Sequence, residues 1–226
     1  PCRASDISET ITSAANTASG SQFPKGVTTV TWAATDNASP ANTSTCSFTV
    51  TVNDTQAPTI TCPANQTKPA DAGLCTAVTN YTTPTFTDNC TGGSVSIVSG
   101  LASGQPFPKG INTVQWKATD GVGLTKTCTF RVTVNDTQAP TITCPASQSL
   151  NTDANLCSAV ATYATPTASD NCTTPPTVVK TSGLASGSAF PKGTSTVVWK
   201  ATDGATLTNT CSFTVTVNDT QLPTIT

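Results

Sequence analysis

Ten cysteines and a set of regularly spaced aspartates are the residues of this chain whose types and spacing could do chemistry. Four cysteines recur 82 positions later: Cys46 as Cys128, Cys62 as Cys144, Cys75 as Cys157 and Cys90 as Cys172. The chain has no histidine and no C-x-x-C, which disfavours structural zinc and thiol redox motifs. An even count at repeated spacings instead indicates disulfides formed in an oxidising, extracellular compartment.

The cysteine period matches an internal repeat. The segment VNDTQAPTITCPA at 52–64 returns unchanged at 134–146, and a shortened copy, VNDTQLPTIT, stands at 217–226. The proline in each copy stiffens the segment, because its ring fixes φ. We therefore expect the C-terminal part of one repeat at 1–54, complete repeats at 55–136 and 137–219, and the start of another at 220–226, as a piece of a longer array.

The strongest local pattern is alternation with period two. Apolar and polar residues alternate over 113–119 and again over 128–134, and the same pattern recurs in the other repeats. Further strands are expected before these: a short one around 60–62, a longer one at about 76–87 and one around 95–98. The prediction is an all-β fold: tandem immunoglobulin-like antiparallel β-sandwiches of about 82 residues, disulfide-stapled, with about seven strands each. Three tryptophans fall on the apolar face and are predicted to be core: Trp32, Trp116 and Trp199.

The four cysteine positions of a repeat, numbered first to fourth in chain order, allow three connectivities. If the first and second flank one end of the sandwich and the third and fourth the other, neighbours in sequence pair. The residues 1–54 support this reading, because they contain only a third and a fourth cysteine. The predicted bonds are Cys2–Cys46, Cys62–Cys75, Cys90–Cys128, Cys144–Cys157 and Cys172–Cys211.

The chain carries little charge. Charged residues are 10% of the total, the net charge is −2, and serine and threonine together number 71. Nucleic acid and anionic membranes need a basic face, so neither is expected as a partner. No apolar run approaches the ~20 residues of a membrane span, so no direct membrane insertion is expected in this segment.

Several motifs together resemble a known family. FPKG, then V-x-W-x-A-T-D, then T-C-S-F-T-V-T-V-N-D and a proline-containing linker into T-C-P are similar to the hyalin repeat, or HYR domain. The resemblance covers the whole chain and implies an immunoglobulin-like fold, tandem extracellular arrays and roles in adhesion. The copies look most like repeats of giant bacterial cell-surface proteins, among them the SprB-like adhesins of gliding bacteria. Hyalin of the animal extracellular matrix is a second setting for such repeats.

An enzyme is not expected. The chain has no histidine, no paired carboxylates within one motif and no glycine-rich phosphate loop after a strand, and the cysteines are assigned to disulfides. No catalytic residue is therefore predicted, and no cofactor is required.

The one ligand signal is acidic. In a sandwich, two loops and the incoming linker meet at one end, which would gather Asp54, Asp88 and Asp120, and likewise Asp136, Asp170 and Asp203. Carboxylate oxygens at a domain joint are what Ca²⁺ prefers. Two alternatives stand beside this: the aspartates simply form turns through their own side chains, or the joint is dry, held by backbone hydrogen bonds and apolar contacts at Pro58 or Pro140 and Ile60 or Ile142.

The leading hypothesis is a structural and adhesive cell-surface protein. Its repeats would form a stiff stalk or filament in cell-surface adhesion, including gliding motility, with neighbouring repeats and surface glycans or proteins as partners and with self-assembly into a filament open. The alternative is a module that recognises a glycan or protein through its loops, or an extracellular-matrix protein like hyalin. Residues 91–98 (TGGSVSIV) and 173–180 (TTPPTVVK) differ between the two full repeats, as that alternative expects.

Overall fold

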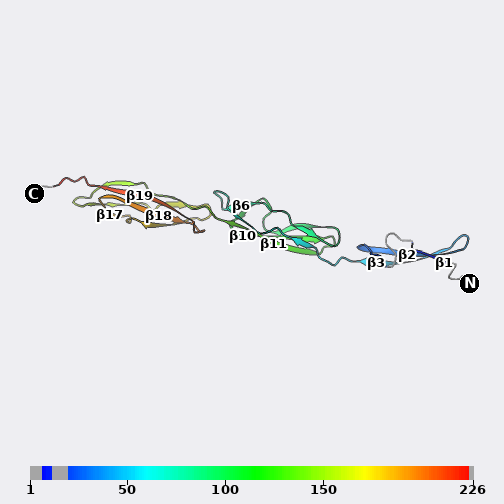
Figure 1. Ribbon diagram of the computed structural model, residues 1–226. Helices are drawn as coiled ribbons and strands as arrows, with labels where there is room; N and C mark the ends of the chain where they lie inside the picture. The colour runs from blue at the N-terminus through cyan, green and yellow to red at the C-terminus, as the bar shows by residue number, and fades with distance from the viewer. Residues whose placement is uncertain (1–6, 12–19, 224–226) are drawn as a thin grey trace. The chain divides into compact units, whose positions relative to one another are not determined.

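The computed structural model describes residues 7–11 and 20–223 of the 226, and this part of the chain contains strands and loops but no helix (Figure 1). It forms two compact units. Unit 1 consists of Pro1–Cys62, Pro84–Ser96 and Trp116–Cys128, and unit 2 of Pro63–Thr83, Ile97–Gln115 and Thr129–Thr226. The predicted all-β, immunoglobulin-like architecture of tandem repeats is confirmed.

In unit 1, the first repeat is one antiparallel sheet of three strands. Its order is β1 (Ile7–Ile11), β2 (Gly26–Asp36) and β3 (Thr43–Val52). β2 and β3 are paired from Gly26 opposite Val52 to Thr35 opposite Thr43. Among the described residues, no second layer covers the face of this sheet on which Phe48 lies, and Phe48 is 52% exposed.

The same open face corrects the prediction for the tryptophans. Trp32 is 39% exposed and, with Cys46, lines a groove on the sheet. Trp116 and Trp199 are partly buried, and Trp199 packs against the core of the third repeat. A tryptophan on the inner face is covered only where the second layer is present.

The third repeat, in unit 2, has both layers. The larger sheet has the order β13 (Gln148–Asn151), β19 (Thr208–Asn218), β18 (Gly193–Thr202) and β16 (Thr177–Ser182). β18 and β19 lie side by side as an antiparallel pair (Figure 1). Two strand pairs complete the repeat: β12 (Thr141–Thr143) with β15 (Thr167–Ser169), and β14 (Ser158–Ala161) with β17 (Ser188–Pro191).

Alanine, valine and phenylalanine side chains fill the core of this repeat. Phe190, Val197 and Val215 are fully buried, and Phe213 packs edge to face on Tyr163 with ring centroids 4.9 Å apart. The hydroxyl group of Tyr163 donates a hydrogen bond to the carbonyl oxygen of Leu184. This bond satisfies the polar end of a largely apolar side chain.

The second repeat has the same eight strands. Its four-stranded sheet has the order β5 (Gln66–Pro69), β11 (Thr125–Asn135), β10 (Gly110–Asp120) and β8 (Gly93–Ser99). The remaining pairs are β4 (Thr59–Thr61) with β7 (Thr85–Thr87), and β6 (Thr76–Thr79) with β9 (Gln105–Pro108). The single strand predicted at 76–87 is therefore two strands, β6 and β7, that pair with different partners. The chain breaks at 80–84, where Tyr81 is buried and Pro84 follows.

Two strands that the alternation did not predict, β5 and β13, decide the disulfides. β5 runs parallel to β11 with Gln66 opposite Val132, and β13 runs parallel to β19 with Gln148 opposite Val215. Cys62 and Cys128 lie four residues before Gln66 and Val132, and the two cysteines are bonded. Cys144 and Cys211 lie four residues before Gln148 and Val215 and are bonded in the same way. The predicted bonds Cys62–Cys75, Cys90–Cys128, Cys144–Cys157 and Cys172–Cys211 are wrong, because the parallel strand carries the chain away from the first cysteine before the second is reached.

Among the described residues, Cys46, Cys90 and Cys157 have no disulfide partner. Cys2 lies outside the described residues, so the pairing Cys2–Cys46 stays a prediction.

Candidate functional site

The candidate site is the joint between consecutive repeats, which occurs twice. The first joint, between the first and second repeats, lies in unit 1 and comprises Lys25, Asp54, Gln56, Asp88 and Cys90. The second joint, between the second and third repeats, lies in unit 2 and comprises the loop 71–75, Lys109, Asp136, Gln138, the segment 170–173 and Asp203.

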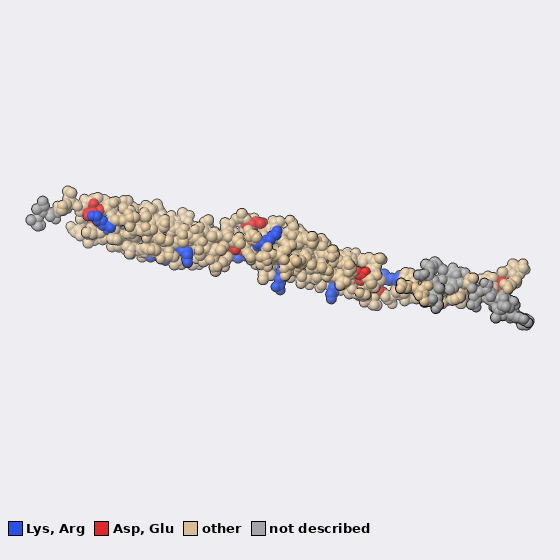
Figure 2. All heavy atoms as spheres, viewed as in Figure 1, with Lys and Arg blue, Asp and Glu red and all other residues tan. Residues whose placement is uncertain are grey.

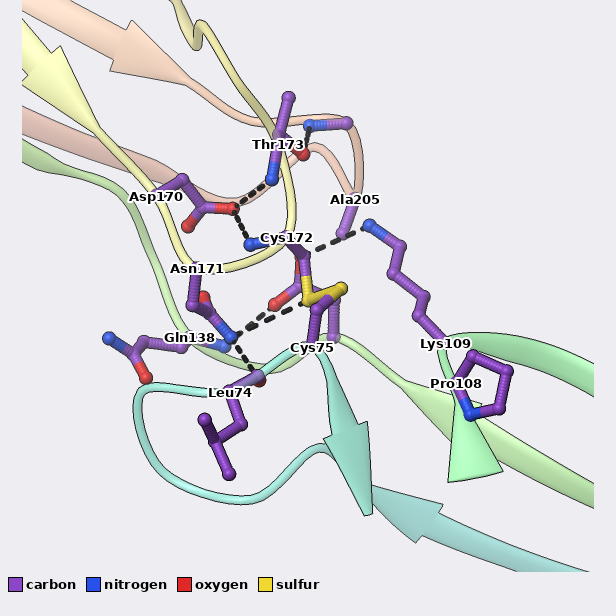
Figure 3. The surroundings of a disulfide bond; sticks show 12 residues. Leu74, Cys75, Pro108, Lys109, Gln138, Asp170, Asn171, Cys172, Thr173 and Ala205 are labelled. Carbon is purple, nitrogen blue, oxygen red and sulfur yellow. Dashed lines mark hydrogen bonds and ion pairs between the residues drawn. A yellow bond between two sulfur atoms is a disulfide. The ribbon is translucent and has the colours of Figure 1, made fainter. Parts of the chain in front are cut away.

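A disulfide crosses the second joint (Figure 3). Cys75, the second cysteine of the second repeat, is bonded to Cys172, the third cysteine of the third repeat, with the Cα atoms 4.8 Å apart. The bonded residues are 97 positions apart. The sequence predicted bonds within repeats only, and this one joins neighbours.

Hydrogen bonds surround this disulfide. The side-chain amide of Asn171 donates to the carbonyl oxygen of Leu74 at 2.6 Å (Figure 3). The backbone N–H of Gly73 donates to Oε1 of Gln138 in the linker at 3.0 Å. The loop that carries Cys75 is therefore held by the following repeat and by the linker, independently of the sulfur atoms.

A lysine of the FPKG motif supplies the positive charge of the joint. The ammonium group of Lys109 donates to Oδ2 of Asp136 at 3.1 Å, and the Asp136 side chain is fully buried. The backbone N–H of Lys109 also donates to the carbonyl oxygen of Cys75 at 3.0 Å. Lys109 thus contacts both the linker aspartate and the loop that carries Cys75.

The sequence analysis missed Lys109 and Gln138, although a signal was present. Lysine recurs in each FPKG, as Lys25, Lys109 and Lys192, and glutamine in each NDTQ, as Gln56, Gln138 and Gln221. In so weakly charged a chain, a lysine at the same place in every repeat indicates a fixed ionic partner.

The second joint gathers the predicted acidic residues. Asp136, Asp170 and Asp203 each place a carboxylate oxygen within 4.8 Å of the others. Each also forms a turn through its side chain: Asp170 accepts from the N–H groups of Cys172 and Thr173, and Asp203 from those of Ala205 and Leu207. The turns and the clustering occur together, since one oxygen of each residue makes the turn and the three carboxylates still lie close to one another.

Two oxygens of this cluster lack a protein partner. Oδ1 of Asp170 and Oδ2 of Asp203 are buried and accept no hydrogen bond from the described residues. Lys109 is the cation paired with Asp136, and the described part of the chain gives Asp170 and Asp203 no ion pair. Three carboxylates thus face one ammonium group, which leaves two negative charges. An open cleft of about 470 Å³, lined by Lys109, Asn135, Asp136 and Ala205 among others, lies beside them.

The first joint is built from the same motifs, with one difference. Asp54 and Asp88 lie together with the sulfur of Cys90, all within 4.8 Å, whereas Asp120 is not a member of this group. Asp120 uses Oδ1 to accept from the N–H groups of Val122 and Leu124 in its own hairpin. Lys25 lies 3.7 Å from Asp54. The predicted set of three carboxylates is therefore complete only at the second joint.

The surroundings of Cys90 favour its protonated thiol over the thiolate. Burial raises the pKa of Cys90, and a hydrogen bond to Asp54 and the negative charges of Asp54 and Asp88 raise it further, against a smaller opposing effect of Lys25. Because the thiolate is the nucleophilic form of cysteine, these surroundings lower the reactivity of Cys90 at a given pH.

The face of the chain drawn in Figure 2 is mostly neutral, with scattered charged side chains. Within the residues that the structure describes, there is no helix with the length and apolar character needed to cross a membrane.

Comparison with known proteins gives one curated relative at high significance. Hyalin of Strongylocentrotus purpuratus is 38% identical over 170 residues, which is 72% of this chain and 14% of hyalin. The chain therefore spans a small part of that protein. The similarity supports an extracellular, adhesion-type role at the level of the repeats.

Solved cadherin structures resemble the chain distantly. A protocadherin gammaB7 fragment, EC3-6, has a TM-score of 0.37 and 16% identity, covering 93% of this chain and 67% of that one. Mouse cadherin-23 EC22-24 also has a TM-score of 0.37 and 16% identity, covering 84% of this chain and 74% of that one. Drosophila N-cadherin EC1-3 has a TM-score of 0.32 and 12% identity, covering 88% of this chain and 79% of that one. Similarity at this level carries no functional information.

A family model describes the chain nearly from end to end. The HYR domain matches residues 1–52, 53–134 and 135–217. These three consecutive matches include both joints and all the strands described above except the last residue of β19. The chain belongs to the HYR domain family.

Proposed function

We propose that this chain is a section of a load-bearing extracellular stalk that serves in cell-surface adhesion, of the kind found in giant bacterial surface adhesins, including those used for gliding. The observation that carries the proposal is the Cys75–Cys172 disulfide between two repeats. A protein whose repeats only needed to fold would place its disulfides within them.

The bond gives the joint a second covalent connection. One path between the repeats runs from Cys128 through the linker to Cys144, and the other passes through Cys75 and Cys172. Breaking one backbone bond in the linker leaves the second path intact. This redundancy suits a stalk that carries tension and meets proteases outside the cell.

Cleavage within the linker tests the proposal directly. A specific protease site replaces residues 138–142, and the cut chain is analysed on gels with and without reductant. We expect one band of full mass without reductant and two fragments with it. The Cys75→Ser variant serves as the control and should separate into two fragments in both gels. Separation of the parent chain without reductant would remove the basis of the stalk.

We also propose that a divalent cation, Ca²⁺ in an extracellular setting, binds at the second joint. The two uncompensated negative charges, the two buried oxygens without protein partners and the adjoining cleft support it. Oxygen ligands suit Ca²⁺, which takes six to eight, so water and backbone carbonyl groups would complete the shell. Such an ion would draw Asp136 in the linker towards Asp170 and Asp203 in the following repeat.

A second candidate function is recognition of a surface glycan or protein. The residues that differ between the full repeats, 91–98 and 173–180, fall largely on β8 and β16, which are edge strands of their sheets. Val98 and Val179 on these strands are half exposed. Edge strands with exposed apolar side chains can accept an extended partner segment. Binding to a glycan array or to host-surface proteins that is lost on exchanging 173–180 for 91–98 would support this candidate.

A further inference from the structure

The loop that carries the unpaired Cys157 has the same internal structure as the loop that carries Cys75. Oδ2 of Asp71 and Oδ2 of Asp153 each accept from the backbone N–H of the third residue of the next strand, Val78 at 2.9 Å and Val160 at 3.1 Å. The turn is also closed alike, since Leu74 donates to Asp71 at 2.9 Å and Leu156 to Asp153 at 3.0 Å. The loop therefore holds its shape without the disulfide.

The linker side of this loop is repeated as well. The backbone N–H of Lys192 donates to Cys157 at 3.0 Å, as Lys109 does to Cys75. Gln221 accepts from the N–H of Asn155 at 3.3 Å, as Gln138 accepts from Gly73. Asn155 has φ 62° and Gly73 φ 74°, so both turns use the left-handed region. These contacts of the second joint, which are made by the loop and the linker without the following repeat, are thus also present around Cys157.

Cys90 occupies the opposite half of such a joint. Its N–H donates to Oδ2 of Asp88 at 3.0 Å, and that of Cys172 donates to Oδ2 of Asp170 at 2.9 Å. The linker turn is also shared, with Gln56 and Gln138 each donating a backbone N–H to an aspartate at 3.3 Å. Residues 1–52 contain no cysteine at the second position that could bond to Cys90.

We propose that Cys157 bonds to the third-position cysteine of a following HYR repeat, and Cys90 to the second-position cysteine of a preceding one. Each repeat is then joined to both neighbours by a disulfide as well as by the linker. The inference rests on the proposed array, and it identifies the partner as another repeat that presents a cysteine in the Asx turn of a D-N-C motif.

The bond forms by oxidation of two thiols. Each cysteine loses a proton, the two sulfur atoms lose two electrons, and an external disulfide of the oxidising compartment accepts both and becomes two thiols. Thiol–disulfide exchange through a mixed-disulfide intermediate has the same overall balance of protons and electrons. No group of this chain other than the two thiols takes part.

The test extends the chain by one further copy of residues 137–219 and maps thiols and disulfides by mass spectrometry under non-reducing conditions. In the parent chain, Cys157 should be alkylated. In the extended chain, the free thiol should move from Cys157 to the second cysteine of the added copy, so the number of free thiols does not change. A copy whose third cysteine is replaced by serine should leave Cys157 alkylated.

Two outcomes would overturn the proposal. Cys157 could stay fully alkylated in the extended chain, or it could bond to a second molecule and give a covalent dimer on a non-reducing gel. Neither outcome depends on the linker-cleavage result, which concerns Cys75 and Cys172. Failure of the stalk and failure of this extension are therefore distinguishable.

Discussion

Lys109 and Asp136 form an ion pair of 3.1 Å in which the carboxylate is completely buried, while the matching pair of Lys192 and Asp219 has the same length but an Asp219 side chain that is 36% exposed. The two pairs occupy the same place in consecutive repeats. They differ in that only Asp136 has a described repeat following it, so the comparison isolates the effect of that repeat on the linker carboxylate.

Replacing Lys109 with methionine should destabilise the second joint. The change leaves Asp136 buried without its cation, which costs about 3 kcal/mol in comparable cases. Lys192→Met is the matched control, and loss of this exposed pair should destabilise the chain much less. The free energies of unfolding come from denaturant titration. Equal effects of the two substitutions would mean that the following repeat contributes nothing to the pair.

Removing the inter-repeat disulfide should loosen the joint without unfolding the repeats. For a loop of 97 residues the chain-entropy model gives on the order of 4 to 5 kcal/mol. In Cys75→Ser, amide hydrogen exchange should accelerate around Gly73 and Asn171 while Val197 and Val215 stay protected. Cys144→Ser should do the reverse and expose the core of the third repeat. Uniform acceleration in Cys75→Ser would show that the joint and the cores unfold as one.

Calcium should raise the unfolding temperature of the chain, because an ion that binds only the folded joint stabilises it. Asp203→Asn should abolish the increase, since asparagine keeps the oxygen that makes the turn and removes the charge. Asp120→Asn is the control, because it makes the same change in the same type of turn outside the three-carboxylate group. This variant should retain the calcium-dependent increase in unfolding temperature. Calorimetry with calcium and then with chelator supplies the measurement. An unfolding temperature that responds to neither calcium nor chelator would mean that Lys109 and water alone compensate the negative charge of the cluster.

The stability supplied by Lys192 and Asp219 should depend on pH in a defined direction. The hydrogen bond from Lys192 lowers the pKa of Asp219, and the backbone N–H of Gln221 lowers it further. Since the folded-state pKa lies below the ordinary value of 3.8, the contribution is complete above that value and disappears as the pH falls through the lowered pKa. NMR titration of Asp219 should show its midpoint moving upward in Lys192→Met.

The thiol of Cys90 should react slowly with iodoacetamide at neutral pH and faster as the pH rises above 9, because burial and Asp54 raise its pKa. Asp54→Asn removes the second of these causes and should increase the rate at a given pH. Cys157, which is exposed, provides the internal reference in the same sample. A rate for Cys90 that does not change in Asp54→Asn would exclude the carboxylate as a cause.

The sequence was sufficient for the parts of the fold that depend on local alternation. The long strands β10 and β11 and their counterparts were predicted, because apolar residues alternate along them and a short turn joins each pair. β5 was not predicted, because Gln66–Pro69 has no apolar alternation and its partner lies 66 residues away in β11. The error in the disulfides followed from that one missing strand.

The acidic cluster was anticipated for a sound geometric reason, since loops at one end of a sandwich converge. What the sequence did not reveal was the cation, because Lys109 stands in a different motif and reaches Asp136 only through the fold. The clustering of Asp54 and Asp88 without Asp120 also depends on side-chain orientation, which alternation does not determine.

The interleaved order of the disulfides has a consequence for how the chain is made. As a repeat emerges during export, its first cysteine appears well before its fourth, and the second and third come between them. Cys62 therefore meets Cys75 long before Cys128, and Cys75 must wait for a residue of the next repeat. Pairing in order of appearance would trap the wrong bonds, and their rearrangement takes seconds to hours depending on the catalyst. We therefore expect a disulfide isomerase to raise the yield of correctly paired chain, and the benefit should grow with every repeat added.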